Sequence, residues 1–186
     1  DNEPEVYEKT GKMLNAKDYI AFRLTGEFAT DYSDASGTNL LDIEKKVWSD
    51  EMLRALDIPA RLLPPLHRSS DVIGGVTEEA ARATGLLAGT PVVLGGGDGS
   101  CACVGAGVVR PGRAYNVLGS SSWISLAAEK PLFDEEMRTF TWVHLDEKLY
   151  TPCGTMQAAG YSYSWFRDAL GGEEKRLAAE QGISAY

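Results

Sequence analysis

The sequence of 186 residues carries 18 basic and 27 acidic side chains, which give a formal net charge of −9, and 44% of its residues are hydrophobic. A chain of this length buries about 70% of its unfolded surface when it folds, so it needs no disulfide or metal for stability, and its acidity with scattered basic residues argues against a nucleic-acid partner. Three cysteines, an acidic N-terminus and the lack of an apolar run of about 20 residues favour a cytoplasmic protein with no membrane partner and no secretion signal.

The first half of the sequence is predicted to be largely helical. Apolar side chains in residues 6–24 recur at close to 3.6-residue spacing and predict one amphipathic helix that ends at Gly26. Residues 28–38 are mostly small, hydroxyl-bearing or acidic, so we expect them to form a polar surface or the wall of a site and to supply no core. Further helices are predicted at 50–56, capped by Ser49, and from Thr77 to Gly85, with a proline-rich connector between them.

From Thr90 onward the pattern changes from helical to strand-rich. Residues 91–94 predict a short buried strand that runs into a glycine-rich turn, and the small residues at 100–107 predict a closely packed helix. Strands are expected at 113–118 and 123–128, joined by a turn at 119–122, and a hairpin at 139–145 and 148–151. A helix at 157–170 and a polar helical tail complete the chain. The change of pattern places a domain boundary between Gly85 and Thr90.

A glycine-rich turn, then Asp98 and a small-residue helix, is the strongest local signal. Glycines let a ligand approach the backbone closely, and a helix start offers free N–H groups to an anion. Gly97, Gly99 and Ala102 match a dinucleotide-binding pattern, but no acidic residue follows about 20 positions later to hold a ribose. Asp98 itself is either an N-cap or an ionised general base for phosphoryl transfer.

Other features also have both a structural and a functional interpretation. Residues 119–122 are either an ordinary hairpin turn or a turn that offers N–H and O–H donors to phosphate. Trp123 is either a core residue or an aromatic wall for a sugar, and the small residues at 158–160 either pack closely or let a nucleotide lie against the helix start. We expect structural roles for His67, His144, Cys101 and Cys103, with both cysteines buried.

Five motifs occur together in an order that resembles the FGGY family of carbohydrate kinases, most of all its xylulose kinase branch. The resemblance covers about residues 4–170. Its motifs are residues 15–20 with 23–26, residues 30–38, Leu56-Asp57-Ile58-Pro59, Gly95-Gly96-Gly97-Asp98 and Gly119-Ser120-Ser121-Ser122.

The resemblance implies an α/β fold of the actin-like ATPase (ribonuclease H-like) type, in which two domains enclose a cleft. Residues 1–88 would be the C-terminal part of the family's N-terminal domain, and residues 89–186 the N-terminal part of its C-terminal domain. The implied reaction is ATP-dependent phosphorylation of a sugar hydroxyl. Because the chain is acidic, Mg²⁺ is expected to accompany ATP and to supply much of the positive charge, with no metal-ligating residue assigned.

The resemblance also implies roles for individual residues. Asp98 matches the family's catalytic base. The other implied contacts are Asp98, Gly99 and Trp123 to the sugar, Gly119, Ser120 and Ser121 to ATP at the second phosphate turn, and Gly160 and Ser164 to ATP from a helix. Ser121 departs from the usual Gly-Thr-Gly pattern, and Ser164 replaces a longer amide of the glycerol kinase branch. That branch carries Gln at the position of Gly99, which argues against glycerol.

The largest departure from the family is that its N-terminal Asp-x-Gly-Thr phosphate loop and its C-terminal adenosine loop are not found in these residues. We therefore expect an internal piece of a kinase, inactive alone. Xylulose is favoured over ribulose, gluconate or glycerol by overall likeness only, and a homodimer is left open. Two other classes of protein stay under consideration. One is a non-catalytic nucleotide-binding protein of the actin-like ATPase fold, and the other is a dinucleotide-binding domain, which the missing ribose-binding acid disfavours.

Overall fold

The computed structural model describes residues 2–185. Its helices are α1 (Pro4–Lys9), α2 (Ala16–Thr25), α3 (Tyr32–Ser36), α4 (Asp50–Ala55), the 3₁₀ helix η1 (Ala60–Leu62), α5 (Glu78–Thr84), α6 (Asp98–Gly105), α7 (Gly160–Ala169) and α8 (Gly172–Gln181). Its strands are β1 (Thr30–Asp31), β2 (Leu41–Asp42), β3 (Val47–Trp48), β4 (Leu66–His67), β5 (Val72–Gly75), β6 (Pro91–Val93), β7 (Ala114–Leu118), β8 (Ser122–Leu126), β9 (Thr139–Val143) and β10 (Tyr150–Met156).

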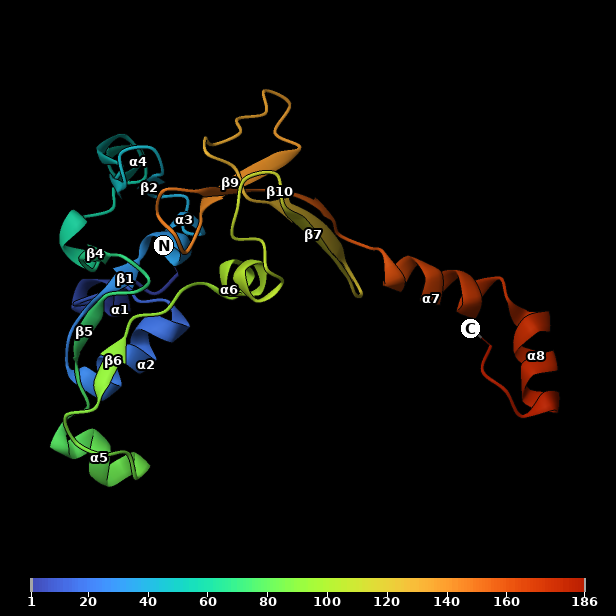
Figure 1. Cartoon of the computed structure of the whole chain (residues 1–186), viewed down its shortest axis with the longest axis horizontal. Helices are drawn as coiled ribbons and strands as arrows, with labels where there is room; N and C mark the ends of the chain where they lie inside the picture. The colour runs from blue at the N-terminus through green and yellow to red at the C-terminus, as the bar shows by residue number, and fades with distance from the viewer. Residues whose placement is uncertain (1, 186) are drawn as a thin grey trace.

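An antiparallel sheet in the order β7-β8-β10-β9 organises the second half of the chain. The first half contains smaller pairs, of which β1-β4 is parallel and β2-β3 is antiparallel. Helix α6 packs on the large sheet through a buried cluster of Cys103, Val108, Ala127 and Leu149. Figure 1 shows that α7 and α8 follow β10 and extend away from the rest of the molecule as an arm.

Several helix ends and turns form where the sequence predicts them. The side chains of Ser49 and Thr77 accept hydrogen bonds from the first turns of α4 and α5. Gly26 and Gly85 end α2 and α5 in the left-handed conformation that glycine adopts without strain. Both predicted hairpins are present as β7-β8 and β9-β10, so these predictions are confirmed.

The single helix predicted at residues 6–24 is wrong, because the chain forms α1 and α2 with an extended segment between them. A long-range contact explains the break: the Met13 N–H donates to the Leu62 carbonyl, and Lys12 Nζ donates to the carbonyls of Arg61 and Leu63. Residues 10–15 are therefore held against η1, which an unbroken helix would prevent.

Residues 28–38 were expected to supply no core, and this expectation is wrong as well. Ala35 of α3 is fully buried in a cluster with Leu41, Val143 and Tyr150, so it joins the first half of the chain to β9 and β10. The Val143 N–H also donates to Ser36 Oγ over 3.1 Å in a buried position. This contact between α3 and β9 fixes the large sheet against the first half of the chain.

Residues 91–94 form a strand that is less buried than predicted. Pro91 and Val93 are exposed and only Leu94 is buried, since β6 pairs with β5 alone at the edge of the molecule. Cys101 is exposed, in contrast to the prediction, whereas Cys103 is buried. The division of the chain into residues 1–88 and 89–186 stays a prediction, and β6 pairs with β5 across it.

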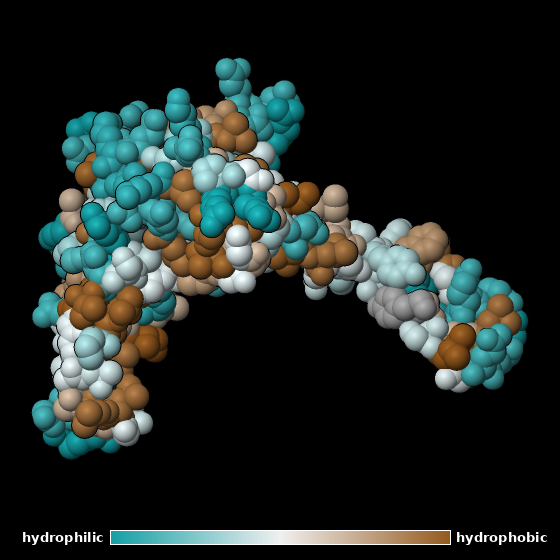
Figure 2. Space-filling model, viewed as in Figure 1, coloured by the Kyte–Doolittle hydropathy of each residue, from teal (hydrophilic) through white to brown (hydrophobic). Residues whose placement is uncertain are grey.

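Hydrophobic side chains also lie on the surface of the body and of the α7-α8 arm (Figure 2). On α7 the exposed aromatic residues are Tyr161, Tyr163, Trp165 and Phe166. No helix within residues 2–185 has both the length and the apolar character that crossing a bilayer requires.

Candidate active site

The carboxylate of Asp98 lies exposed at the first residue of α6. Gly97 takes the N-cap position, and its backbone leads directly from the glycine-rich turn into the helix. Asp98 Oδ1 accepts a hydrogen bond from the Gly99 N–H at 2.7 Å, which is a local bond of the first turn. Asp98 is therefore not the N-cap, and it lies in the first turn of α6.

Asp98 lines a groove of about 420 Å³ that the large sheet and α6 form together. Two further predicted residues, Gly99 and Trp123, line the same groove. The structure thus brings the three predicted sugar contacts to one place. The other lining residues are Ala102 of α6 and Val117, Phe140, Trp142, Cys153 and Thr155 of the sheet.

Strand pairing explains why these sheet residues share one face. Trp123 lies opposite Val117 on β7 and opposite Thr155 on β10, so the three side chains point to the same side of the sheet. Phe140 and Trp142 are two positions apart on β9, with ring centroids 5.0 Å apart and ring planes inclined by 50°. Aromatic rings therefore form much of the groove wall.

A hydrogen-bonded tyrosine fixes the position of Trp123 relative to α6. Trp123 Nε1 donates to the Tyr115 hydroxyl at 3.2 Å, and this hydroxyl donates to the Gly99 carbonyl at 3.0 Å. Burial raises the pKa of Tyr115, so the hydroxyl keeps its proton for the Gly99 carbonyl. Gly99 is tightly placed as well, because a Cβ there would lie 3.0 Å from Cζ3 of Trp142.

The turn at residues 119–121 contacts the start of α7. The N–H of Gly160 donates to the Gly119 carbonyl at 3.0 Å, and the N–H groups of Ala159 and Tyr161 donate to the Ser120 carbonyl. A Cβ at Gly160 would lie 2.5 Å from the Gly119 carbonyl oxygen, so only glycine permits this approach. The predicted ATP contacts Gly119, Ser120 and Gly160 are thereby neighbours.

The remaining two predicted ATP contacts lie on the same two elements. Ser121 is half-buried and its carbonyl accepts from the Gly119 N–H at 2.8 Å, which closes the turn. Ser164 is half-buried on α7, one helical turn after Gly160. Ser120 is exposed, so its hydroxyl and the turn backbone present donors of the kind that phosphate oxygens accept.

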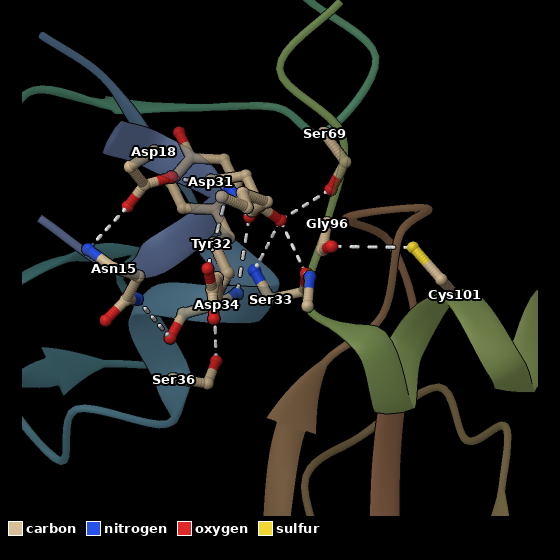
Figure 3. Close-up of polar contacts among 12 residues, drawn as sticks. Asn15, Asp18, Asp31, Tyr32, Ser33, Asp34, Ser36, Ser69, Gly96 and Cys101 are labelled. Carbon is tan, nitrogen blue, oxygen red and sulfur yellow. Dashed lines mark hydrogen bonds and ion pairs between the residues drawn. The ribbon is translucent and has the colours of Figure 1, made fainter. Parts of the chain in front are cut away.

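A buried carboxylate, Asp31, supports the glycine-rich turn from the first half of the chain (Figure 3). Its Oδ2 accepts from Ser33 Oγ at 2.5 Å, from Ser69 Oγ at 2.7 Å and from the Ser33 N–H at 2.9 Å. Ser33 Oγ in turn accepts from the Gly97 N–H at 3.0 Å. The sequence motif that contains Asp31 and Ser33 therefore lies directly behind the turn that carries Asp98.

Lys17 neutralises part of the acidic cluster around Asp31. Its Nζ lies 2.6 Å from Asp18 Oδ1, 2.9 Å from Asp31 Oδ1 and 3.7 Å from Asp34 Oδ2. Burial lowers the pKa of Lys17, but its hydrogen bonds to Asp18 and Asp31 and their charges outweigh burial and raise that pKa overall. Burial raises the pKa of Asp34; Lys17 partly opposes the shift, and the charges of Asp18 and Asp31 add to it.

Sequence reasoning missed Trp142, Phe140 and Tyr115 as groove residues and Ser33 as a support of the turn. The spacing of Phe140 and Trp142 predicts a shared face, which was a usable signal, but nothing local shows that α6 covers that face. The ring of His144 is buried and bonds to the Val108 carbonyl, and His67 lies 3.7 Å from Asp71; the structural roles expected for the two histidines stay predictions.

The part of the chain that the structure describes, residues 2–185, contains no group of three or more His, Cys, Asp or Glu side chains arranged to hold a metal ion. Mg²⁺ is usually held by one or two carboxylates together with substrate phosphates and water, so it does not require such a group. Mg²⁺ stays a prediction that accompanies ATP.

Comparisons with known proteins agree on one family. Residues 1–105 match the model of the N-terminal domain of the FGGY family of carbohydrate kinases. The chain is 38% identical over 98% of its length to an autoinducer-2 kinase of Yersinia enterocolitica and 36% identical over 100% to a xylulose kinase of Bacillus subtilis. It spans 35% and 37% of those two proteins.

A solved structure agrees with this result. The xylulose kinase of Rhodospirillum rubrum superposes with a TM-score of 0.85 at 32% identity, over 96% of this chain and 36% of that protein. The chain therefore has part of the α/β actin-like ATPase fold that these kinases share. With its family model, its relatives and its fold in agreement, the chain belongs to the FGGY family of carbohydrate kinases.

Proposed function

We propose that this chain is part of a kinase that transfers the γ-phosphoryl group of ATP to a hydroxyl group of a sugar, with Asp98 as general base. One observation carries the proposal: Asp98, at a helix start, lines a groove together with the aromatic side chains of Trp123, Phe140 and Trp142. Aromatic faces suit the C–H faces of a sugar, and a single carboxylate beside them suits one of its hydroxyls.

Each proposed residue has a defined part in the reaction. The sugar lies between Trp123 and the first turn of α6, with one hydroxyl at Asp98. Asp98 accepts the hydroxyl proton while the sugar oxygen forms a bond to the γ-phosphorus, and the bond from that phosphorus to the β,γ-bridging oxygen breaks to release ADP. Bound ATP supplies the phosphoryl group, and an Mg²⁺ ion that accompanies ATP would neutralise part of its charge.

The turn at residues 119–121 and the start of α7 are the proposed ATP contacts. The exposed Ser120 and the half-buried Ser121 offer hydroxyl donors to phosphate oxygens, and Gly160 keeps α7 close to the turn. Ser164 lies one turn further along α7, where it extends the same contact surface. Residues 1–88 and 89–186 are the proposed parts of the two kinase domains.

Xylulose is the proposed sugar, and a substrate panel tests this choice. In a full-length kinase that contains this chain, ADP release should depend on xylulose more strongly than on ribulose, gluconate, glycerol or autoinducer-2. Preference for another sugar of the panel would replace xylulose but keep the kinase. Absence of sugar-dependent ADP release with all of them, despite ATP binding, would favour the non-catalytic nucleotide-binding alternative. The 186-residue chain alone is proposed to be inactive.

A further inference from the structure

We propose that Ser33 is a positioning residue for phosphoryl transfer, which holds the base Asp98 in place through the backbone N–H of Gly97. The proposal rests on the proposed function, because it assigns Ser33 a part in that reaction. It does not require Ser33 to contact either substrate.

The Ser33 hydroxyl has the geometry that such a role needs. Ser33 Oγ donates its hydrogen to Asp31 Oδ2, with 2.5 Å between the two oxygens, so the lone pairs of Oγ point in other directions. One of them accepts the N–H of Gly97 at 3.0 Å. Gly97 directly precedes Asp98, so this bond fixes the backbone from which the carboxylate projects. Ser33 and Gly97 are 64 positions apart in the sequence, so the bond joins the two halves of the chain.

Asp31 is fixed well enough to orient the Ser33 hydroxyl. It is fully buried and also accepts from Ser69 Oγ at 2.7 Å and from Lys17 Nζ at 2.9 Å. Hydrogen bonds with an ionised acceptor are roughly twice as strong as neutral ones. The carboxylate therefore has little freedom to move, and the hydroxyl that it orients has little freedom to turn.

The glycine-rich turn needs such an anchor because it has no side chains of its own. A methyl group at Gly96 would collide with the Leu145 side chain and lie 2.9 Å from Ser33 Oγ, so the turn must run close to Ser33 without a side chain. The Gly95 N–H is held separately by the Ser69 carbonyl at 2.9 Å. The bond from Gly97 to Ser33 is thus the side-chain anchor that lies next to Asp98.

Ser69 offers a matched control for Ser33. Both serines are buried, and both donate their hydroxyl hydrogen to Asp31 Oδ2. Only the Ser33 hydroxyl also accepts from Gly97. Truncation of either serine removes one hydrogen bond to the same carboxylate oxygen, so a role limited to holding Asp31 predicts similar effects of the two substitutions on kcat. A positioning role predicts that they differ in kcat.

The experiment measures steady-state kinetics and thermal unfolding of a full-length kinase that contains this chain, with Asp98→Asn as reference. Ser33→Ala should lower kcat about 10- to 100-fold, because a misplacement of about 1 Å costs up to about 100-fold. The KM for ATP should stay within about 2-fold, because Ser33 acts on the base. Ser69→Ala should lower kcat by less than about 3-fold, and it should lose less thermal stability than Ser33→Ala, which also leaves the Gly97 N–H without its acceptor. If Ser33→Ala does not fold, Ser33→Cys keeps the side-chain connectivity with a bulkier and weaker acceptor and should also lower kcat.

Equal kcat values for the Ser33 and Ser69 variants would overturn the proposal, and so would a rise in the KM for ATP with unchanged kcat. The reference variant separates this outcome from failure of the proposed function. If Asp98→Asn stays active, the assignment of the base is wrong. If Asp98→Asn is inactive while Ser33→Ala behaves like Ser69→Ala, only the role of Ser33 is wrong.

Discussion

The contact between Gly160 and the 119–121 turn gives a prediction whose size follows from the geometry. In Gly160→Ala the new Cβ would lie 2.5 Å from the Gly119 carbonyl oxygen, about 0.9 Å short of ordinary contact at 3.4 Å. The obstacle is backbone, which does not rotate aside as a flexible side chain would. The turn and α7 must therefore separate, and the three hydrogen bonds that join residues 159–161 to Gly119 and Ser120 weaken.

Overpacking of this kind costs about 1–3 kcal/mol, and the better helix propensity of alanine offsets at most about 1 kcal/mol. We expect a net local loss of about 1–2 kcal/mol in the docking of α7. A loss of this size raises the population of the undocked state by roughly 5- to 30-fold. Because α7 belongs to an arm that extends from the body, the loss should be local rather than global (Figure 1).

Hydrogen exchange of the backbone amides of α7 measures this loss, in a full-length kinase that contains the chain. The amides of residues 160 and 161 should exchange roughly 5- to 30-fold faster in Gly160→Ala, and the KM for ATP should rise. Gly172→Ala is the matched control, because Gly172 is also the first residue of a helix but a Cβ there meets nothing within 4 Å. Unchanged exchange in Gly160→Ala, or an equal effect of the control, would refute the argument.

Two further predictions concern the groove and the acidic cluster. Gly99→Ala places a Cβ 3.0 Å from Trp142 Cζ3, so kcat/KM for the sugar should fall several-fold. Adding Trp142→Phe to this variant should restore part of the lost kcat/KM. Additive losses in this double-mutant cycle would show that the two residues do not interact. Burial is the main reason that the pKa of Asp34 lies above its ordinary value of 3.8. The folded state then binds more protons than the unfolded state between 3.8 and the raised pKa, so stability falls as pH rises through that interval. The free energy of unfolding of Asp34→Asn, measured relative to the parent by urea unfolding, should therefore increase as pH rises from about 3.5 to about 7. A difference between variant and parent that stays constant or decreases with pH would contradict the burial argument.

The elements that the sequence predicts correctly depend on local chemistry. Ser49 and Thr77 cap their helices with their own side chains, and Gly26 and Gly85 adopt the left-handed conformation at the helix ends. Such signals act within a few residues, so they can be recognised from the sequence without knowledge of the tertiary structure. The helix predicted at 6–24 fails because the Met13 N–H bonds to Leu62, a partner that no local pattern reveals.

The candidate site shows the same division between local and long-range information. Sequence motifs point to Asp98, Gly99 and Trp123, and the structure places all three in one groove, although their roles stay proposals. The approach of Trp142 to Gly99 depends on how α6 packs against β9. The bond from Gly97 to Ser33 depends on a contact between the two halves of the chain. Both need the tertiary structure, and neither has a signature in the sequence.

The most direct test of the central claim is the rate of the chemical step in Asp98→Asn, measured by single-turnover phosphoryl transfer in a full-length kinase that contains this chain. Asparagine keeps the size of the side chain but cannot accept the sugar proton. If Asp98 is the general base, the rate should fall by about 10²- to 10⁴-fold while ATP affinity and thermal stability stay close to those of the parent. A chemical step within about 3-fold of the parent rate would contradict the assignment, since removal of a general base costs at least about 10²-fold.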